Sequence, residues 1–203
     1  FEMKRLSLMA DIRFVTQDKP LGLGHAVLVA KSLVGHEPFA IMLPDDIVRN
    51  DTGVLSQMLN TGEELSGGVL AVEQVLWEEV GKYGVIEPHQ LSGKYYQVKH
   101  LIEKPNISNA PSNLAIVGRY ILSPNIFDSL ECTVPGANGE IQLTDALSQL
   151  LEYQEIYAYE FEGYRYDCGT PIGLLKASLG FGLSRRETSS DVLRMLNDIQ
   201  AGP

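Results

Sequence analysis

The sequence contains little of what marks several classes of protein. It has two cysteines among 203 residues, too few for a disulfide framework. Cys132 and Cys168 also lack the spacing of metal ligands, so we expect two free thiols. No apolar run approaches the roughly 18 residues that a membrane span needs, and the first residues show no signal-peptide pattern. We therefore expect a cytoplasmic protein with no membrane partner.

Basic residues are also scarce. The chain has 16 Lys and Arg against 26 Asp and Glu, and its formal net charge is −10. Nucleic acids and anionic membranes are bound through clustered Lys and Arg. This balance predicts no nucleic-acid partner, and any phosphorylated ligand must be met by a local site.

What is present is typical of a globular protein, with 44% hydrophobic and 21% charged residues. Strand-like and helix-like patterns alternate without an internal repeat or a low-complexity linker. The length suffices for one substantial core, and we expect one mixed α/β domain over residues 1–203. In the first third we expect strands at 11–16, 38–45 and 68–73 and helices at 24–34 and 52–65, the second helix capped by Thr52.

The rest of the chain predicts a hairpin and then a return to helices. Strand-like segments at 83–88 and 94–103 flank the polar turn at Ser92-Gly93. We expect further strands at 113–122 and 156–161. We expect one helix that begins at Ser123-Pro124, a second over 142–153, and two more at the end of the chain, the last of which begins at 189–191.

The most informative stretch is the apolar run from Pro38 that ends in Asp45 and Asp46. It has the length of a buried strand, and open α/β sheets bind ligands at the carboxyl ends of their strands. Adjacent carboxylates repel and are costly to desolvate unless a cation, a base or a hydrogen-bond donor shares the site. Mg²⁺ is the natural candidate. The alternative is that Asp46 caps a turn and Asp45 is merely exposed.

A second candidate is the glycine-containing loop from Gln17 to His25. Gly22 and Gly24 would let backbone N–H groups approach a ligand, next to the positive end of the following helix. The amide of Gln17 can both donate and accept hydrogen bonds, which suits a nucleobase edge. The alternative is an ordinary turn in which His25 is a structural hydrogen-bonding group.

Two further segments place charge beside a bend. In Glu103-Lys104-Pro105, a bend at the proline would bring the carboxylate to sugar hydroxyls and the ammonium to a phosphate; the alternative is a solvated charge pair. Asp167 ends an aromatic run and would complete the oxygen shell that Asp45 begins; the alternative is a helix cap. The block from Gly139 to Asp145 can be read as no more than a helix start.

The order of these motifs carries a resemblance. From Gln17 to Pro171 the chain reads Gln-x4-Gly-Leu-Gly-His-Ala, Leu-Pro-Asp-Asp, Tyr-Gly-Val-Ile, Glu-Lys-Pro, Asn-Leu-Ala-Ile-Val-Gly-Arg-Tyr, Gly-Glu-Ile-Gln-Leu-Thr-Asp and Asp-Cys-Gly-Thr-Pro. In this it closely resembles bacterial UTP–glucose-1-phosphate uridylyltransferases. The resemblance implies a Rossmann-like nucleotidyltransferase fold with a mixed sheet, and a reaction that joins UTP and glucose 1-phosphate into UDP-glucose and pyrophosphate.

The resemblance also implies roles for residues at matching positions. Asp45, Lys104 and Asp167 would be catalytic, with Mg²⁺ held by Asp45 and Asp167 and the sugar phosphate by Lys104. The substrate-binding residues would be Gln17 and Gly22 at the uracil, Asp46 beside the metal, and Gly84, Glu103, Ile116 and Glu140 around the sugar. An ionised phosphate attacks the α-phosphorus, so no general base is needed and the residues mainly position two polyanions.

One signature of the family is absent from the sequence: the glycine-rich loop Gly-x-Gly-Thr-Arg with its following lysine. We therefore expect an N-terminally truncated version of the fold, the C-terminal portion of the family's domain, inactive or nearly so by itself. Its exposed sheet edge favours association, and we expect a homo-oligomer that uses the last helix, 191–200.

Two alternatives to a uridylyltransferase stay open. One is another sugar-1-phosphate nucleotidyltransferase, such as a thymidylyltransferase. The other is a non-catalytic regulatory paralogue, which the missing loop favours and the presence of Asp45, Lys104 and Asp167 opposes.

Overall fold

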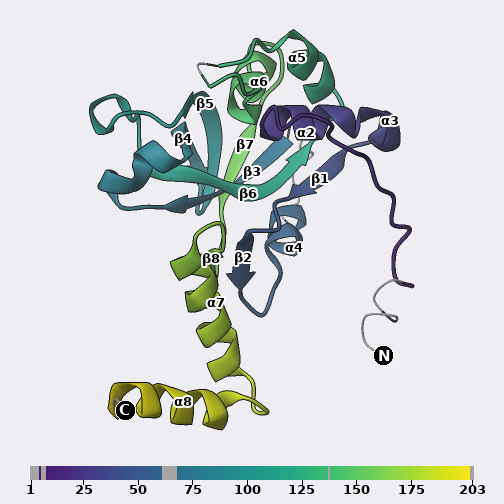
Figure 1. The fold of residues 1–203 in the computed structure, drawn as a ribbon. Coiled ribbons are helices and arrows are strands. Elements are labelled where there is room, and N and C mark those ends of the chain that lie inside the picture. Colours follow the sequence, from purple (N-terminus) through teal and green to yellow (C-terminus); the bar gives the residue numbers. More distant parts are fainter. Residues whose placement is uncertain (1–4, 6–7, 61–67, 137, 202–203) are drawn as a thin grey trace.

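A six-stranded mixed sheet forms the centre of the protein (Figure 1). The structure, a computed structural model, describes residue 5 and residues 8–60, 68–136 and 138–201. The strand order is β1-β6-β3-β7-β5-β4, in which β3 and β7 are parallel and the other neighbours antiparallel. The strands are β1 (Phe39–Met42), β3 (Gly68–Gln74), β4 (Gly84–Ser92), β5 (Tyr95–Glu103), β6 (Leu114–Leu122) and β7 (Tyr157–Glu160).

A second, two-stranded sheet pairs β2 (Asp46–Arg49) with β8 (Tyr164–Asp167) in antiparallel register. Because β2 follows β1 after a short turn, this small sheet lies beside the end of β1. The register sets Asp46 opposite Asp167. Two segments far apart in the sequence therefore meet at the point where both carry carboxylates.

Helices pack on both faces of the large sheet. The helices α2 (Leu23–Val29), α5 (Ile126–Cys132) and α6 (Leu143–Leu150) contact one another beside it, and α4 (Val54–Leu59) contacts β3. Alternate side chains of β3 enter two cores: Leu70 and Val72 the larger, Val69 and Ala71 the smaller. Burial on both faces explains why this strand is a continuous apolar run. The shorter helices are α3 (Lys31–Val34), η1 (Trp77–Lys82) and η2 (Ile107–Asn109).

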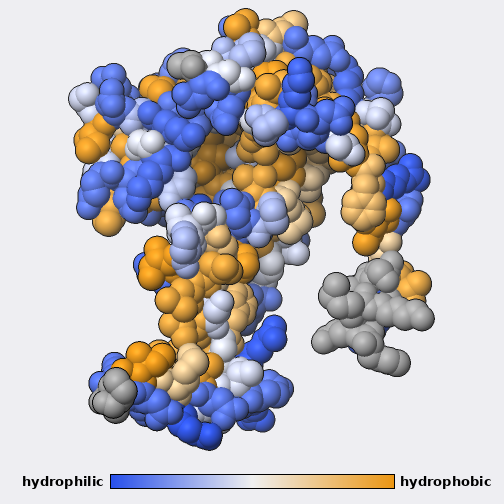
Figure 2. Space-filling model, in the orientation of Figure 1, coloured by the Kyte–Doolittle hydropathy of each residue, from blue (hydrophilic) through white to orange (hydrophobic). Residues whose placement is uncertain are grey.

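The two last helices extend away from the sheet (Figure 1). They are α7 (Pro171–Ser184) and α8 (Ser189–Ala201), and their main contacts are with β8 and with each other. Figure 2 shows hydrophobic side chains gathered along them. Exposed apolar residues on this surface include Ile172, Leu174, Leu175, Leu193 and Ile199.

The expected mixed α/β fold is confirmed, together with the strands at β3 to β7, the helix at α6 and the two closing helices. The predicted hairpin is β4 and β5, and Gly93 in its turn has φ +55, which only glycine adopts without cost. Both cysteines are free thiols. None of the helices in the described residues is long and apolar enough to cross a membrane.

One strand prediction is wrong and a second is confirmed only in part. Residues 11–16 alternate like a strand but pair with no strand in the described part of the chain, and Phe14 is 91% exposed. The run from Pro38 forms a strand only over β1, at the sheet edge, where Met42 is 57% exposed. Apolar character alone does not fix burial, because burial depends on what lies beside the strand.

Two helix starts also differ from expectation. Helix α4 begins at Val54 with Gly53 at the N-cap, and no side chain caps it, so Thr52 is not the cap. The end expected for this helix, 61–65, lies outside the described residues. Helix α5 begins at Ile126 with Asn125 at the N-cap, so Pro124 precedes the helix.

A buried phenol in the larger core gives a pH prediction. Tyr96 donates a 2.8 Å hydrogen bond to Glu160 Oε2, and burial together with this bond raises the pKa of Tyr96 to about 12. The folded state holds this proton more tightly than the unfolded state, so its stabilising effect is complete below pH 10 and is lost as the pH rises toward 12. Urea unfolding at pH 9 and 11.5 should therefore show a smaller loss of stability in Tyr96→Phe than in the wild type; equal losses would contradict this.

Candidate active site

A cavity of about 440 Å³ lies where the small sheet meets the large one. Every residue that the sequence predicted for the site lines it, except Gln17: they are Gly22, Asp45, Asp46, Gly84, Glu103, Lys104, Ile116, Glu140 and Asp167. The structure thus brings together residues from both halves of the chain, while their individual roles stay predictions.

Two carboxylates of the cavity lining, those of Asp45 and Asp167, lie close to Gly169. Asp45 lies in the turn between β1 and β2, and its carbonyl accepts a 2.7 Å hydrogen bond from Cys168 N. A Cβ atom on Gly169 would lie 3.3 Å from Asp45 Oδ2 and 3.2 Å from Asp167 Oδ1. The space beside this glycine is therefore faced by one oxygen from each carboxylate.

This pair fits a divalent cation whose coordination is completed by a ligand. The described residues contain no group of three or more His, Cys, Asp or Glu placed to hold a metal by themselves. Mg²⁺ characteristically uses one or two carboxylates and takes its other oxygens from water and substrate phosphates.

The structure also decides whether Asp167 caps a helix. Its Oδ1 accepts a 3.1 Å hydrogen bond from Gly169 N, and the residue that caps α7 is Thr170. The helix-cap alternative for Asp167 is therefore wrong.

Asp46 differs from its neighbour because it is buried. Its Oδ1 accepts a short hydrogen bond from Arg165 Nε, and its Oδ2 accepts one of 2.7 Å from Gly118 N. The sequence predicted that a cation, a base or a hydrogen-bond donor lies beside the two adjacent carboxylates, and at Asp46 the charged donor is Arg165. Asp46 lines the cavity with both carboxylate oxygens already hydrogen-bonded, while Asp45 is exposed.

Arg165 is a residue of the site that sequence reasoning missed. Its side chain is only 9% exposed and forms ion pairs with Asp46 and with Glu73, the second at 2.7 Å. Its guanidinium also lies over the Tyr83 ring, 5.2 Å from the centroid. Burial opposes its charge, but Tyr83 and the two carboxylates outweigh burial and raise its pKa. The sequence signal is a single arginine inside the aromatic strand β8.

The bend at Glu103-Lys104 is made by the lysine itself. Lys104 has φ +45, a conformation uncommon outside glycine, and its N–H donates to Tyr83 O at 2.9 Å. Its Nζ lies 3.6 Å from Glu103 Oε1. Both side chains consequently line one cavity, although the prediction had placed the bend at Pro105.

Close packing surrounds the loop that carries Gly22. This glycine has φ +93, and a Cβ there would lie 2.9 Å from Glu140 Cβ. Gln17 lies behind it, where Nε2 donates to Gly22 O at 3.1 Å and lies 2.9 Å from His25 Nδ1. His25 is therefore the structural hydrogen-bonding group of the alternative reading, and Gln17 supports the loop from outside the cavity lining.

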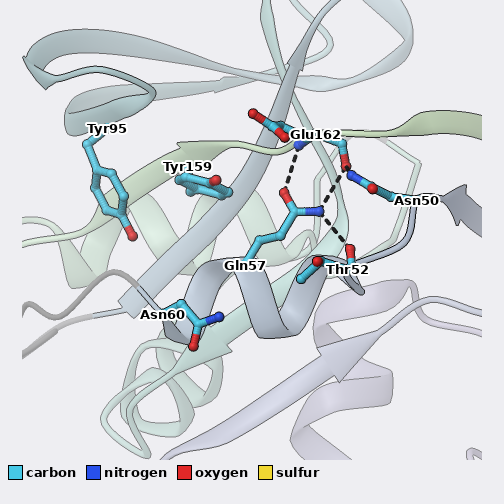
Figure 3. Close-up of a pocket in the computed structure, with 7 residues that line it drawn as sticks. All are labelled: Asn50, Thr52, Gln57, Asn60, Tyr95, Tyr159 and Glu162. Carbon is cyan, nitrogen blue, oxygen red and sulfur yellow. Dashed lines mark hydrogen bonds between the residues drawn. The ribbon is translucent and has the colours of Figure 1, made fainter.

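Another cavity, of about 400 Å³, is lined by polar side chains (Figure 3). Gln57 at its centre donates to Thr52 O and Glu162 O and accepts from Glu162 N. Asn50 also donates to Glu162 O. These amides join loops to one another, so we place the chemistry in the cavity that holds Asp45, Lys104 and Asp167.

The fold and this site agree with the comparisons to known proteins. A family model described as nucleotidyl transferase matches residues 2–181. A UTP–glucose-1-phosphate uridylyltransferase of Bacillus subtilis is 43% identical over 98% of this chain and 68% of its own length. One of Staphylococcus epidermidis is 44% identical over 94% of this chain and 66% of its own length.

Solved structures give the same result. A UDP-glucose pyrophosphorylase complexed with UDP-glucose has a TM-score of 0.82 and 46% identity, covering 85% of this chain and 66% of that one. A UTP-bound enzyme from Acinetobacter baumannii has a TM-score of 0.83 and 34% identity, covering 97% and 72%. The chain belongs to the nucleotidyl transferase family, among the UTP–glucose-1-phosphate uridylyltransferases. It spans about two thirds of the length of these relatives.

Proposed function

We propose that this chain carries the sugar and metal side of a site that transfers a uridylyl group from UTP to glucose 1-phosphate, giving UDP-glucose and pyrophosphate. The observation that carries the proposal is the single cavity in which Asp45, Asp167, Lys104 and Glu103 meet. These four residues bring three carboxylates and one ammonium group together beside the apolar side chain of Ile116. These are the groups that a sugar, a phosphate and a cation require together.

In this proposal each side chain has a separate task. Lys104 binds the phosphate of the sugar and orients its attacking oxygen, while Glu103 accepts hydrogen bonds from sugar hydroxyls beside Gly84. Ile116 and Glu140 border the sugar, and Gln17 holds the Gly22 loop against the uracil. No residue is required to remove a proton, because the attacking phosphate is already ionised.

Nucleotidyltransferases generally use a divalent metal, and we propose Mg²⁺ here. Asp45 and Asp167 would hold it, and when bound it would offset the negative charge that builds between the two substrates. Asp46 would serve the same position indirectly, as the buried partner of Arg165 that fixes the turn.

Binding measurements on the purified chain test the proposal. We expect UDP-glucose to bind in calorimetry with Mg²⁺, UTP to compete better than dTTP, and turnover of UTP with glucose 1-phosphate to stay at background, because the sequence has no Gly-x-Gly-Thr-Arg loop. Absence of UDP-glucose binding would reject the proposal. Preference for dTTP would favour a thymidylyltransferase, an alternative that the relatives do not favour.

The metal position is tested by Asp45→Ala. Removal of one of two carboxylate ligands should weaken Mn²⁺ binding, measured by electron paramagnetic resonance with UDP-glucose present, by at least about tenfold. The unfolding temperature should stay unchanged because Asp45 is exposed. Asp51→Ala, an exposed carboxylate outside the cavity, is the matched control; an equal effect of both substitutions would show that Asp45 does not hold the ion.

Two predictions about the whole molecule remain proposals. The exposed apolar residues of α7 and α8 support self-association through the end of the chain, and hence a homo-oligomer. A cytoplasmic location likewise stays a prediction.

A further inference from the structure

Arg119 makes an unusual set of hydrogen bonds from the middle of β6. Its Nη1 donates to Leu43 O at 2.9 Å and to Gly118 O at 2.7 Å, and its Nη2 donates to Asp46 O. All three acceptors are backbone carbonyls. The guanidinium therefore binds the backbone rather than another side chain.

Two of these carbonyls flank Asp45. Leu43 and Asp46 are the residues at either side of the exposed pair Pro44-Asp45, so the guanidinium holds both ends of the turn that presents the proposed metal ligand. Leu43 N also donates to Gly118 O at 2.9 Å, which ties the same turn to β6. The turn has little packing of its own, because Pro44 and Asp45 are both exposed.

The turn 43–46 is also hydrogen-bonded to the segment that carries Asp167. Asp45 O accepts from Cys168 N, next to Asp167, and the Asp46 carboxylate is held by Arg165 on β8. The distance between Asp45 and Asp167 thus depends on a turn that is fixed at β6 by Arg119, at β8 by Arg165 and just after β8 by Cys168. The Arg119 contacts come from a side chain that can be replaced without altering a proposed ligand or its neighbour in the sequence.

We propose that Arg119 is a positioning residue that holds the turn 43–46 so that Asp45 and Asp167 face the same cation. This inference rests on the proposed function, because it assigns the metal to these two carboxylates. An arginine suits the task because its planar fork carries five donors in fixed directions. A lysine in its place keeps the charge but has a single nitrogen, whereas Arg119 uses two nitrogens to reach its three carbonyls.

The test compares Arg119→Lys with Arg49→Lys. Arg49 also donates to a backbone carbonyl, Gly180 O at 3.2 Å, and lies on β2 away from the turn. We expect Arg119→Lys to weaken Mn²⁺ binding on the order of tenfold, as second-layer substitutions at metal sites do. UDP-glucose affinity in EDTA should change less than twofold. Arg49→Lys should leave both affinities unchanged.

The outcomes separate the inference from the proposal beneath it. If the wild type binds Mn²⁺ through Asp45 and Arg119→Lys binds it equally well, the positioning role is wrong while the site stands. If the wild type shows no Mn²⁺ binding that depends on Asp45, both are overturned. Arg119→Gln, which keeps an amide group as a donor, is compared with Arg119→Ala. A higher Mn²⁺ affinity in Arg119→Gln than in Arg119→Ala supports the positioning role. If these variants lose as much UDP-glucose affinity in EDTA as Mn²⁺ affinity, the positioning role is contradicted.

Discussion

Replacement of Arg165 by leucine is expected to lower the free energy of unfolding by about 3–5 kcal/mol, the cost of removing one partner from a buried ion pair. The Arg165 side chain is 9% exposed, and its two carboxylate partners, Asp46 and Glu73, are on different strands of different sheets. Leucine fills part of the volume but leaves both carboxylates without their cation. Gly118 N remains as a donor to Asp46 and cannot replace a full charge.

The loss should depend on pH. Burial raises the pKa of Glu73 above its ordinary value of 4.5, and the charge of Arg165 opposes this rise. An acid whose pKa is raised by folding stabilises the folded state most below its ordinary pKa and loses that effect as the pH rises through the raised value. Without Arg165 the pKa rises further, so the difference between wild type and Arg165→Leu should be larger at pH 7.5 than at pH 4.5.

Urea unfolding at the two pH values measures this directly. Arg49→Leu is the matched control, since its guanidinium is exposed and donates to one carbonyl, and its cost should stay below about 1 kcal/mol. Addition of Glu73→Gln to Arg165→Leu should recover part of the loss at pH 7.5. A pH-independent loss, or no recovery in the double variant, would show that the ion pairs do not stabilise the junction between the sheets.

Much of the fold could be predicted because its signals are local. The continuous apolar run of β3, the turn at Gly93 between β4 and β5, and the amphipathic helix α6 each depend on residues close in sequence. The gathering of the predicted site residues into one cavity was anticipated by the order of the motifs. It did not follow from any one of them.

The rest could not be predicted, because it depends on neighbours far along the chain. Residues 11–16 have a strand pattern, but a pattern cannot supply a partner strand. Arg165 and Asp46 are 119 positions apart, and Arg119 is 76 positions from Leu43. Each arginine stands alone in its strand, so only the pairing of β2 with β8 and of β1 with β6 reveals what it holds.

Gly173→Ala is expected to disturb both the start of α7 and the metal position. A Cβ at Gly173 would lie 1.6 Å from Asp167 O, inside any possible contact distance, and 2.8 Å from Thr170 Oγ1. The obstacle is backbone, and Thr170 is fixed because it caps the helix through Gly173 N at 3.1 Å. The helix must therefore move or the carbonyl of Asp167 must turn, at a cost toward the upper end of the about 1–3 kcal/mol that overpacking typically brings.

The same helix provides the control. A Cβ at Gly182 meets only Val192 Cγ2, at 2.9 Å, which a side-chain rotation can relieve. Gly182→Ala should be neutral or stabilise the protein by up to about 1 kcal/mol through helix propensity. The unfolding temperature and the Mn²⁺ affinity should both fall in Gly173→Ala, and neither should fall in Gly182→Ala. If Gly173→Ala loses stability but binds Mn²⁺ normally, the Asp167 side chain is not held in place by the turn that leads into α7.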